Sequence, residues 1–131
     1  MIDDDQDDRE IFREAVQKCS PSIETIFAND GVEALQILNC RDIQPDAIFL
    51  DNNMPRMDGV QCLMKLKSTP RTKSIPIVMY TTAGNAVQEQ YILSLGADYF
   101  LKKTNTFNQL CIELEKLLFL IERKLVKRNT S

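Results

Sequence analysis

The chain has 131 residues, 44% of them hydrophobic, which is the size and composition of one domain with a single core. Sixteen basic and nineteen acidic residues give a formal net charge of -3, which excludes a strongly basic nucleic-acid-binding surface. No segment approaches the roughly 20 apolar residues of a membrane helix, and no signal-peptide pattern opens the chain. We therefore expect a cytoplasmic protein without direct contacts to membrane or nucleic acid.

The chain contains four cysteines and no histidine. The absence of histidine excludes Ser-His and Cys-His nucleophile pairs and histidine-based zinc sites. The cysteines form no CxxC motif, so in a cytoplasmic chain we expect them to be small buried apolar residues. They are Cys19, Cys40, Cys62 and Cys111.

The first third of the chain predicts a helix, a strand and a second helix. Apolar residues at helical spacing place the first helix after an acidic run, with Asp7 or Asp8 as its cap and Cys19 near its end. Residues 23–28 are rich in β-branched and aromatic side chains, which predicts a strand. A turn then leads into a second helix over residues 32–40.

A short apolar run over residues 47–50 ends abruptly at Asp51. Such a run is typical of a strand buried on both faces of a parallel sheet. A helix over residues 60–67 follows, and after a polar loop an apolar run over 75–80 predicts the next strand. Taken alone, Asp51 is equally consistent with the start of a turn, so the other strand ends decide its role.

The last third predicts a helix over residues 85–95 with Gly96 as its left-handed stop, followed by a strand over 98–101. Thr104 or Thr106 then caps a final helix of about 20 residues. Strands and helices thus alternate, which predicts an α/β domain with a doubly wound parallel sheet and helices on both faces.

Polar side chains follow the predicted strands where parallel strands share one sheet edge. Asp3 and Asp4 follow Met1 and Ile2, which we take as the end of a first strand. Asp51 follows the strand over 47–50, Thr81 the strand over 75–80, and Lys103 the strand over 98–101. Carboxylates this close repel unless a cation lies among them, and an all-oxygen site suits Mg²⁺. The lysine and threonine would then contact an anion beside the metal. The set predicts an aspartate that accepts a phosphoryl group.

Four motifs in order now identify a resemblance that covers nearly all of residues 1–131. The chain resembles a two-component response regulator receiver domain of the single-domain, chemotaxis-response-regulator kind. The motifs are DDDQDDR over residues 3–9, LDNNMPRMDG over 50–59, VMYTTA over 78–83 and GADYFLKK over 96–103.

The resemblance implies a fold and a function. The fold would be a flavodoxin-like (βα)5 three-layer sandwich around a five-stranded parallel sheet. The function would be phosphorelay signal transduction: the domain takes a phosphoryl group from a sensor histidine kinase or phosphotransfer protein and switches a surface that binds a downstream effector protein. Such a domain is a signalling protein and not an enzyme, because it catalyses only its own phosphorylation and dephosphorylation.

The resemblance also implies roles around a Mg²⁺ ion. Asp51 would be the phosphorylation site. Asp4 would bind the metal directly, Asp3 mainly through a metal-bound water, and Asn53 through its backbone carbonyl.

Three further residues match the family's switch and its lysine. Thr81 would be the hydroxyl that moves towards the phosphoryl group, and Phe100 the aromatic ring that turns inward when it does. Lys103, and not Lys102, matches the family's lysine, since it stands where that lysine precedes the usual proline.

The chain departs from the family pattern at three places. Thr104 replaces the proline after Lys103, and Thr82 stands where a smaller residue is common. Only Met1 and Ile2 precede the acidic pair, whereas a strand usually has about 5–6 residues. We therefore expect the first strand to be truncated in this chain.

Two other functions stay open at this point. A magnesium-dependent phosphohydrolase would use an aspartyl-phosphate intermediate, although Asn53 stands where such enzymes carry a second acid. A pseudo-receiver would bind proteins without phosphorylation. The last helix is apolar beyond one buried stripe at Phe119 and Leu120, which is explained either by extra core contact or by a homodimer through that helix.

Overall fold

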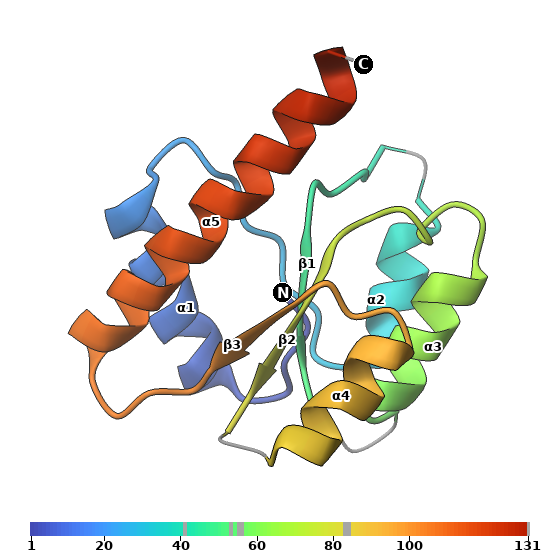
Figure 1. Ribbon diagram of the computed structural model, residues 1–131, viewed down its shortest axis with the longest axis horizontal. Coiled ribbons are helices and arrows are strands. Elements are labelled where there is room, and N and C mark those ends of the chain that lie inside the picture. The colour runs from blue at the N-terminus through green and yellow to red at the C-terminus, as the bar shows by residue number, and fades with distance from the viewer. Residues whose placement is uncertain (41, 53, 55–56, 83–84, 131) are drawn as a thin grey trace.

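The computed structural model describes the backbone of residues 1–40, 42–52, 54, 57–82 and 85–130, and the side chains of those residues up to 125. Within these ranges the chain forms five helices and three strands (Figure 1). The helices are α1 (Gln6–Cys19), α2 (Gly31–Leu38), α3 (Gly59–Ser68), α4 (Ala86–Ser94) and α5 (Phe107–Thr130). The strands are β1 (Ile48–Asp51), β2 (Ile77–Thr81) and β3 (Tyr99–Lys102).

The three strands form one parallel sheet in the order β1-β2-β3. Asp51, the last residue of β1, pairs with Tyr80 of β2, so the carboxyl ends of neighbouring strands lie at one edge. On the other side of β1, Ile2 forms single parallel bridges to Leu50 and to Ala28. The order across the sheet is therefore Ala28, Ile2, β1, β2, β3. The predicted doubly wound parallel sheet is confirmed.

The predicted strand over residues 23–28 was wrong in extent, because only Ala28 takes part in a bridge. Its partner, the first strand, pairs only through Met1 to Asp3: the Ala28 N–H donates to the Met1 carbonyl at 3.0 Å, and the Asp3 N–H donates to the Ala28 carbonyl at 3.0 Å. A strand is held by hydrogen bonds to its neighbour, so a short first strand leaves the second without a ladder. The first strand is therefore short in this structure, as expected from the sequence.

Helices cover both faces of the sheet and give the molecule three layers (Figure 1). On one face, with α2, α3 and α4, Leu50 of β1 belongs to the same apolar cluster as Leu63 of α3. On the other face, with α1 and α5, Phe49 of β1 clusters with Phe12 and Leu114. Successive residues of a strand point to opposite faces, so β1 contributes to both cores.

The ends of the helices follow local capping chemistry. Asp5, and not Asp7 or Asp8 as predicted, caps α1, since its side chain accepts the N–H groups of both later residues. At the start of α5, Thr106 accepts a backbone N–H, which decides between the two predicted caps. Gly96 has a φ of +112°, and this confirms it as the left-handed stop after α4.

The cysteines are free thiols in several environments. Cys62 and Cys111 are buried as predicted, and Cys19 is half-buried. Cys40 is exposed, so the prediction that it is buried was wrong. It lies two residues beyond Leu38, the last buried residue of α2.

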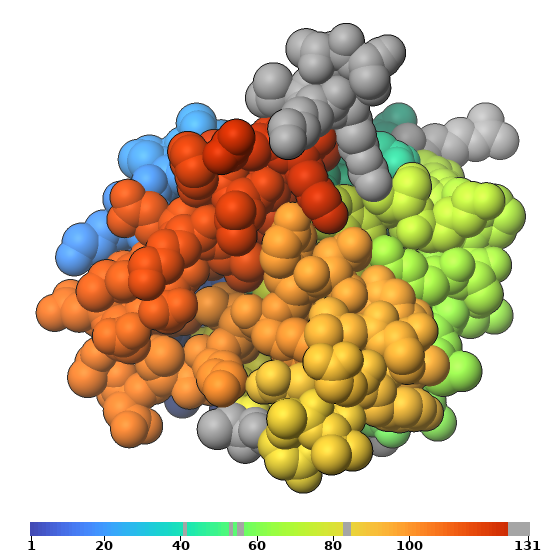
Figure 2. Space-filling view, viewed as in Figure 1, coloured from blue at the N-terminus to red at the C-terminus, as the bar shows by residue number. Residues whose placement is uncertain are grey.

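Helix α5 is 24 residues long and lies across the surface of the molecule (Figure 2), longer than the predicted length. Leu114, Leu117 and Ile121 are buried, whereas Phe119 and Leu120 are exposed. The exposed pair is therefore not explained by core contact, and a homodimer through α5 stays a prediction. None of the described helices is long and apolar enough to cross a membrane.

We expect the two sides of α5 to differ sharply in their effect on stability. Leu114 is 0% exposed, so Leu114→Ala removes packed methyl groups and should lower the free energy of unfolding by about 2–5 kcal/mol. Phe119→Ala is the matched control, because Phe119 is 59% exposed and should change it by about 0.5 kcal/mol or less. Urea denaturation measures both. A similar loss in the two variants would contradict the packing described for α5.

Candidate functional site

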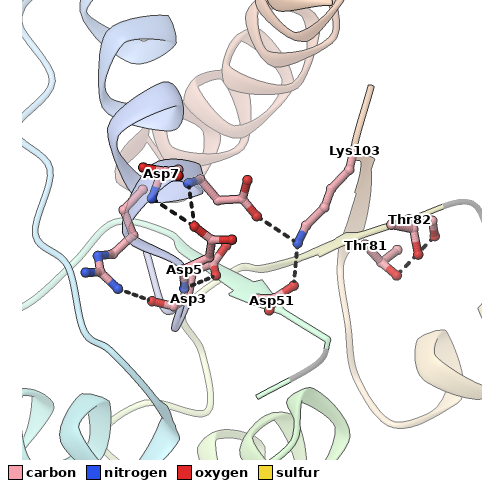
Figure 3. A network of polar contacts seen from close by, with 9 residues as sticks. Asp3, Asp5, Asp7, Asp51, Thr81, Thr82 and Lys103 are labelled. Carbon is pink, nitrogen blue, oxygen red and sulfur yellow. Dashed lines mark hydrogen bonds and ion pairs between the residues drawn. The ribbon is translucent and has the colours of Figure 1, made fainter. Parts of the chain in front are cut away.

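The carboxyl edge of the sheet collects charged side chains from three separate segments (Figure 3). Asp51 ends β1, and Lys103 directly follows β3. Asp3 is held at the same edge because Ile2 bridges to β1, where the Asp51 N–H donates to the Ile2 carbonyl at 2.9 Å. Parallel pairing thus brings together groups 48 and 52 residues apart in sequence.

Gly59 fixes the chain directly after Asp51. Its N–H donates to the Asn52 carbonyl at 3.0 Å, where α3 begins against the end of β1. A Cβ at this position would lie 2.6 Å from the Asn52 Cα and 2.7 Å from the Asp51 carbonyl oxygen. Only glycine allows this approach of two backbones, which explains the Asp-Gly pair at the start of α3.

Asp3, Asp4 and Asp51 form an acidic cluster in which one carboxylate oxygen of each lies within 4.8 Å of the others. Asp3 and Asp51 are buried, at 0% and 3% exposure, and Asp4 is exposed. One oxygen of Asp3 accepts the Asp5 N–H at 3.0 Å, and the other is buried without a hydrogen-bond partner. Burial, and then the Asp51 charge, raise the pKa of Asp3 to about 6.

The cluster fits a hard divalent cation such as Mg²⁺. Its donors are all oxygens, one of them buried without a partner, and the exposed Asp4 leaves one side of the cluster open to solvent. Asn53, the fourth residue predicted to bind the metal, lies outside the described residues.

Lys103 supplies the positive charge of the site. Its Nζ lies 2.9 Å from an Asp51 carboxylate oxygen and 3.3 Å from one of Asp8, and it lies 5.2 Å from the centre of the Tyr80 ring. Burial alone would lower the pKa of Lys103, but hydrogen bonds to Asp51 and Asp8 and the nearby carboxylate charges raise it above its ordinary value. The ammonium is therefore charged at neutral pH.

The loop after β3 places Lys103 without the family's proline. The Lys103 N–H donates to the Thr81 carbonyl at 2.7 Å, which extends the pairing of β3 with β2 by one residue. The described residues contain no cis peptide bond, so Thr104 follows Lys103 through a trans bond. The ammonium still reaches Asp51.

Asp8 is a member of the site that sequence analysis missed as a contact of Lys103. It lies in the first turn of α1, and its carboxylate pairs with Lys103 across 95 residues of sequence. The acidic run that contains Asp8 is apparent in the sequence. Which face of α1 lies towards the edge of the sheet could not be predicted from it. Burial, and after it the charge of Asp8, raises the pKa of Tyr80 to about 12.

The two predicted switch residues stand apart from Asp51 in this conformation. The Thr81 hydroxyl donates to the Thr82 carbonyl at 3.1 Å (Figure 3), and Thr82 is exposed. Phe100 is half-buried and packs against the core on the α4 side of the sheet. The structure thus brings together Asp3, Asp4, Asp51 and Lys103, with Thr81 one strand away.

Comparison with known proteins places this chain in one family. The response regulator receiver domain family matches residues 1–115. Response regulator MprA of Mycobacterium leprae is 37% identical over 117 residues, which are 89% of this chain and 49% of that protein. MprA of Mycobacterium avium is 34% identical over 118 residues, 90% of this chain and 49% of that protein. The chain spans about half the length of these curated relatives.

Solved structures show the same fold. The phosphorylated cyanobacterial phytochrome response regulator RcpA superposes with a TM-score of 0.79 at 27% identity, covering 88% of this chain and 86% of that one. Vibrio cholerae chemotaxis protein CheY4 gives 0.77 at 28% identity, with 92% and 93% covered. The Mn²⁺-bound form of response regulator Rcp1 gives 0.75 at 25% identity, with 88% and 87% covered.

The chain therefore belongs to the response regulator receiver domain family and has its flavodoxin-like fold. It is a receiver domain of the two-component type, a signalling domain that works in phosphorelay through phosphorylation of an aspartate. Domains of this family interact with histidine kinases and with effectors.

We expect Asp3→Asn to stabilise the protein in the absence of divalent cations. The pKa of Asp3 is higher in the folded chain than its ordinary value of 3.8, so ionisation costs stability as the pH rises from about 4 to about 6. At pH 7 the variant should melt a few degrees higher in EDTA. With Mg²⁺ the wild type should gain more than the variant, because the variant lacks one carboxylate.

Thermal melts with EDTA and with MgCl₂ at pH 7 test this expectation, and the exposed Asp42→Asn serves as the control. An Asp3→Asn variant that melts lower than wild type in EDTA would contradict the repulsion inferred within the cluster.

Proposed function

We propose that residues 1–131 act as one receiver domain in which Asp51 accepts the phosphoryl group. The observation that carries this proposal is the buried Asp51 carboxylate, 2.9 Å from the Lys103 ammonium and within 4.8 Å of two further carboxylates. An Asp51 oxygen attacks phosphorus, the bond from phosphorus to the donor breaks, and the donor leaves with the electron pair. When the donor is a phosphohistidine, the leaving imidazole takes up a proton.

The residues around Asp51 would balance the negative charge of the phosphoryl group during this reaction. Asp4 would hold Mg²⁺ directly, and Asp3 would hold it mainly through a water, with the Asn53 carbonyl as a further ligand. The cation would supply positive charge against the phosphoryl oxygens and orient them. Lys103 would move from the Asp51 carboxylate to a phosphoryl oxygen. This is a short displacement, because Lys103 and Asp51 meet at the carboxyl edge of the sheet.

The Thr81 hydroxyl would transmit the change. Its hydrogen bond to the Thr82 carbonyl involves only the adjacent residue, so little structure opposes its rotation towards a phosphoryl group. Phe100 lies on the neighbouring strand and would turn inward into the space that Thr81 leaves. The surface formed by α4, β3 and α5 would then change its affinity for a partner.

A phosphoryl-accepting aspartate requires a protein that donates the phosphoryl group and a partner that responds to it. The donor would be a sensor histidine kinase or a phosphotransfer protein, and the output an effector protein that reads the switched surface. We place the reaction in the cytoplasm, with no direct contact to nucleic acid or membrane. In this scheme the domain catalyses only its own phosphorylation and dephosphorylation.

Incubation with acetyl phosphate and Mg²⁺ tests the acceptor directly. The intact mass of the wild type should rise by one phosphoryl group, and that of Asp51→Asn should not. Asp46→Asn is the control, because Asp46 is exposed and precedes β1 at the opposite end of the strand. A wild type that stays unmodified would make the chain a binding module, and sustained turnover of phosphate monoesters would make it a phosphohydrolase.

A second experiment tests the inferred sharing of Lys103. Asp8 competes with Asp51 for the ammonium and adds negative charge beside the acceptor. Asp8→Asn should therefore lengthen the lifetime of the phosphorylated form several-fold. The decay of the phosphorylated mass after removal of the donor measures it, with the exposed Asp7→Asn in the same helical turn as the control. An equal lifetime in wild type and Asp8→Asn would remove Asp8 from the mechanism.

A further inference from the structure

The aromatic ring of Tyr80 lies in the core directly beside the charged edge of the sheet. Tyr80 is the last but one residue of β2, is 5% exposed and belongs to the apolar cluster on the side of α1 and α5. Its ring centre lies 6.2 Å from that of Phe12 in α1, and its backbone is paired with Asp51 on one side and with Leu101 on the other. Sheet pairing and core packing together therefore fix the position of this ring.

The ammonium of Lys103 contacts this ring as well as two carboxylates. Its Nζ is 5.2 Å from the centre of the Tyr80 ring, 2.9 Å from an oxygen of Asp51 and 3.3 Å from one of Asp8. A cation over the face of an aromatic ring at this distance is attracted by the negative face of the ring, and more strongly where water is excluded. The Lys103 side chain is 24% exposed, so the contact is largely shielded from water.

Burial of the ring distinguishes this contact from the other cation–π contacts of the described residues. In those contacts the ring is exposed or half-buried, so water competes for the cation. Their rings are those of Phe27, Tyr99, Phe107 and Phe119. Tyr80 is thus the one of these aromatic residues whose surroundings favour the attraction of a cation most.

Tyr80 and the proposed switch residue belong to opposite faces of β2. Val78 and Tyr80 lie in the cluster on the α1 side, and Ile77 and Met79 lie in the cluster on the α4 side. Because successive residues of a strand alternate, we expect Thr81 to face the α4 side. Its hydroxyl can then move while the Tyr80 ring, and the lysine on it, stay in place.

We propose that Tyr80 is a positioning residue for the phosphoryl transfer, because its ring keeps the ammonium of Lys103 beside Asp51. Lysine carries a compact charge on a flexible four-carbon stem, so the carboxylates of Asp8 and Asp51 attract the ammonium without fixing its direction. The ring contact limits the directions that remain and holds the charge close to the acceptor oxygen. This inference rests on the function proposed above and gives a role to a residue outside the acidic cluster.

Weakening the negative face of the ring at nearly constant shape tests this role. Phenylalanine and a trifluorinated phenylalanine are placed at position 80 only, since fluorine weakens the attraction of the ring for a cation and changes its size little. The rate of phosphorylation by acetyl phosphate with Mg²⁺ is followed by intact mass. Tyr80→Phe should keep the wild-type rate within about twofold, and the trifluorinated ring should lower it at least about threefold. Equal rates for the two rings would overturn the proposal.

The same trifluorinated side chain at position 12 is the matched control. Phe12 is 3% exposed and packs in the same cluster, whereas Lys103 contacts the ring of Tyr80. Fluorination at position 12 should therefore change the rate by less than about twofold. A loss as large as that at position 80 would show that fluorination acts through core packing, and it would also overturn the proposal.

A second measurement does not depend on phosphorylation. Urea denaturation in EDTA compares the two rings at position 80 in the wild-type background and in Lys103→Met, which keeps a long side chain and removes its charge. With Lys103 present, fluorination should shift the unfolding equilibrium towards the unfolded state at least about threefold more than in Lys103→Met. An equal shift in both backgrounds would overturn the proposal. A wild type that acetyl phosphate leaves unmodified would contradict the function proposed above, and the comparison in urea would still decide whether the ring holds Lys103.

Discussion

The structure depends on the charge balance at the carboxyl edge of the sheet. Asp3 and Asp51 are buried carboxylates, and the Lys103 ammonium lies 2.9 Å from an oxygen of Asp51. Each taken alone would be costly to bury, and their proximity adds repulsion, which is visible in the raised pKa of Asp3. Such a group of carboxylates is typical of a functional site at which a cation or a charged substrate group neutralises it. The unfavourable energy of this site is therefore electrostatic and does not come from the backbone conformation.

The fold supplies the rigidity that this arrangement requires. Because β1 is buried on both faces, Asp51 is held away from solvent. Gly59 allows the start of α3 to pack directly against the backbone of Asp51 and Asn52. Lys103 is held equally firmly, through a backbone hydrogen bond to Thr81 that continues the sheet. The Thr81 hydroxyl, in contrast, is held only by a hydrogen bond to the carbonyl of the next residue. In the function proposed above, this hydroxyl is the group that moves while the charged groups stay in place.

The same sheet shows how one short strand affects its neighbours. The first strand lies between two others, so its short pairing interrupts ladders on both sides. The strand predicted over residues 23–28 is reduced to one bridge at Ala28, although its composition favours a strand. Two cavities, both lined by Met1, Ile26 and Ala47, lie beside these interrupted ladders.

The sequence by itself determined the order of the elements and the residues that gather at one edge. Period-2 and period-3.6 patterns depend on neighbours in sequence, and polar residues at the ends of apolar runs are visible without a structure. The predicted cap of α1 was wrong by two or three residues, because several consecutive acidic residues offer equivalent oxygens and the structure uses Asp5. Only the tertiary structure decided that residues 23–27 lack a strand partner, that Cys40 is exposed, and that Asp8 shares Lys103 with Asp51. Each of these is set by contacts between segments far apart in sequence, which no local pattern encodes.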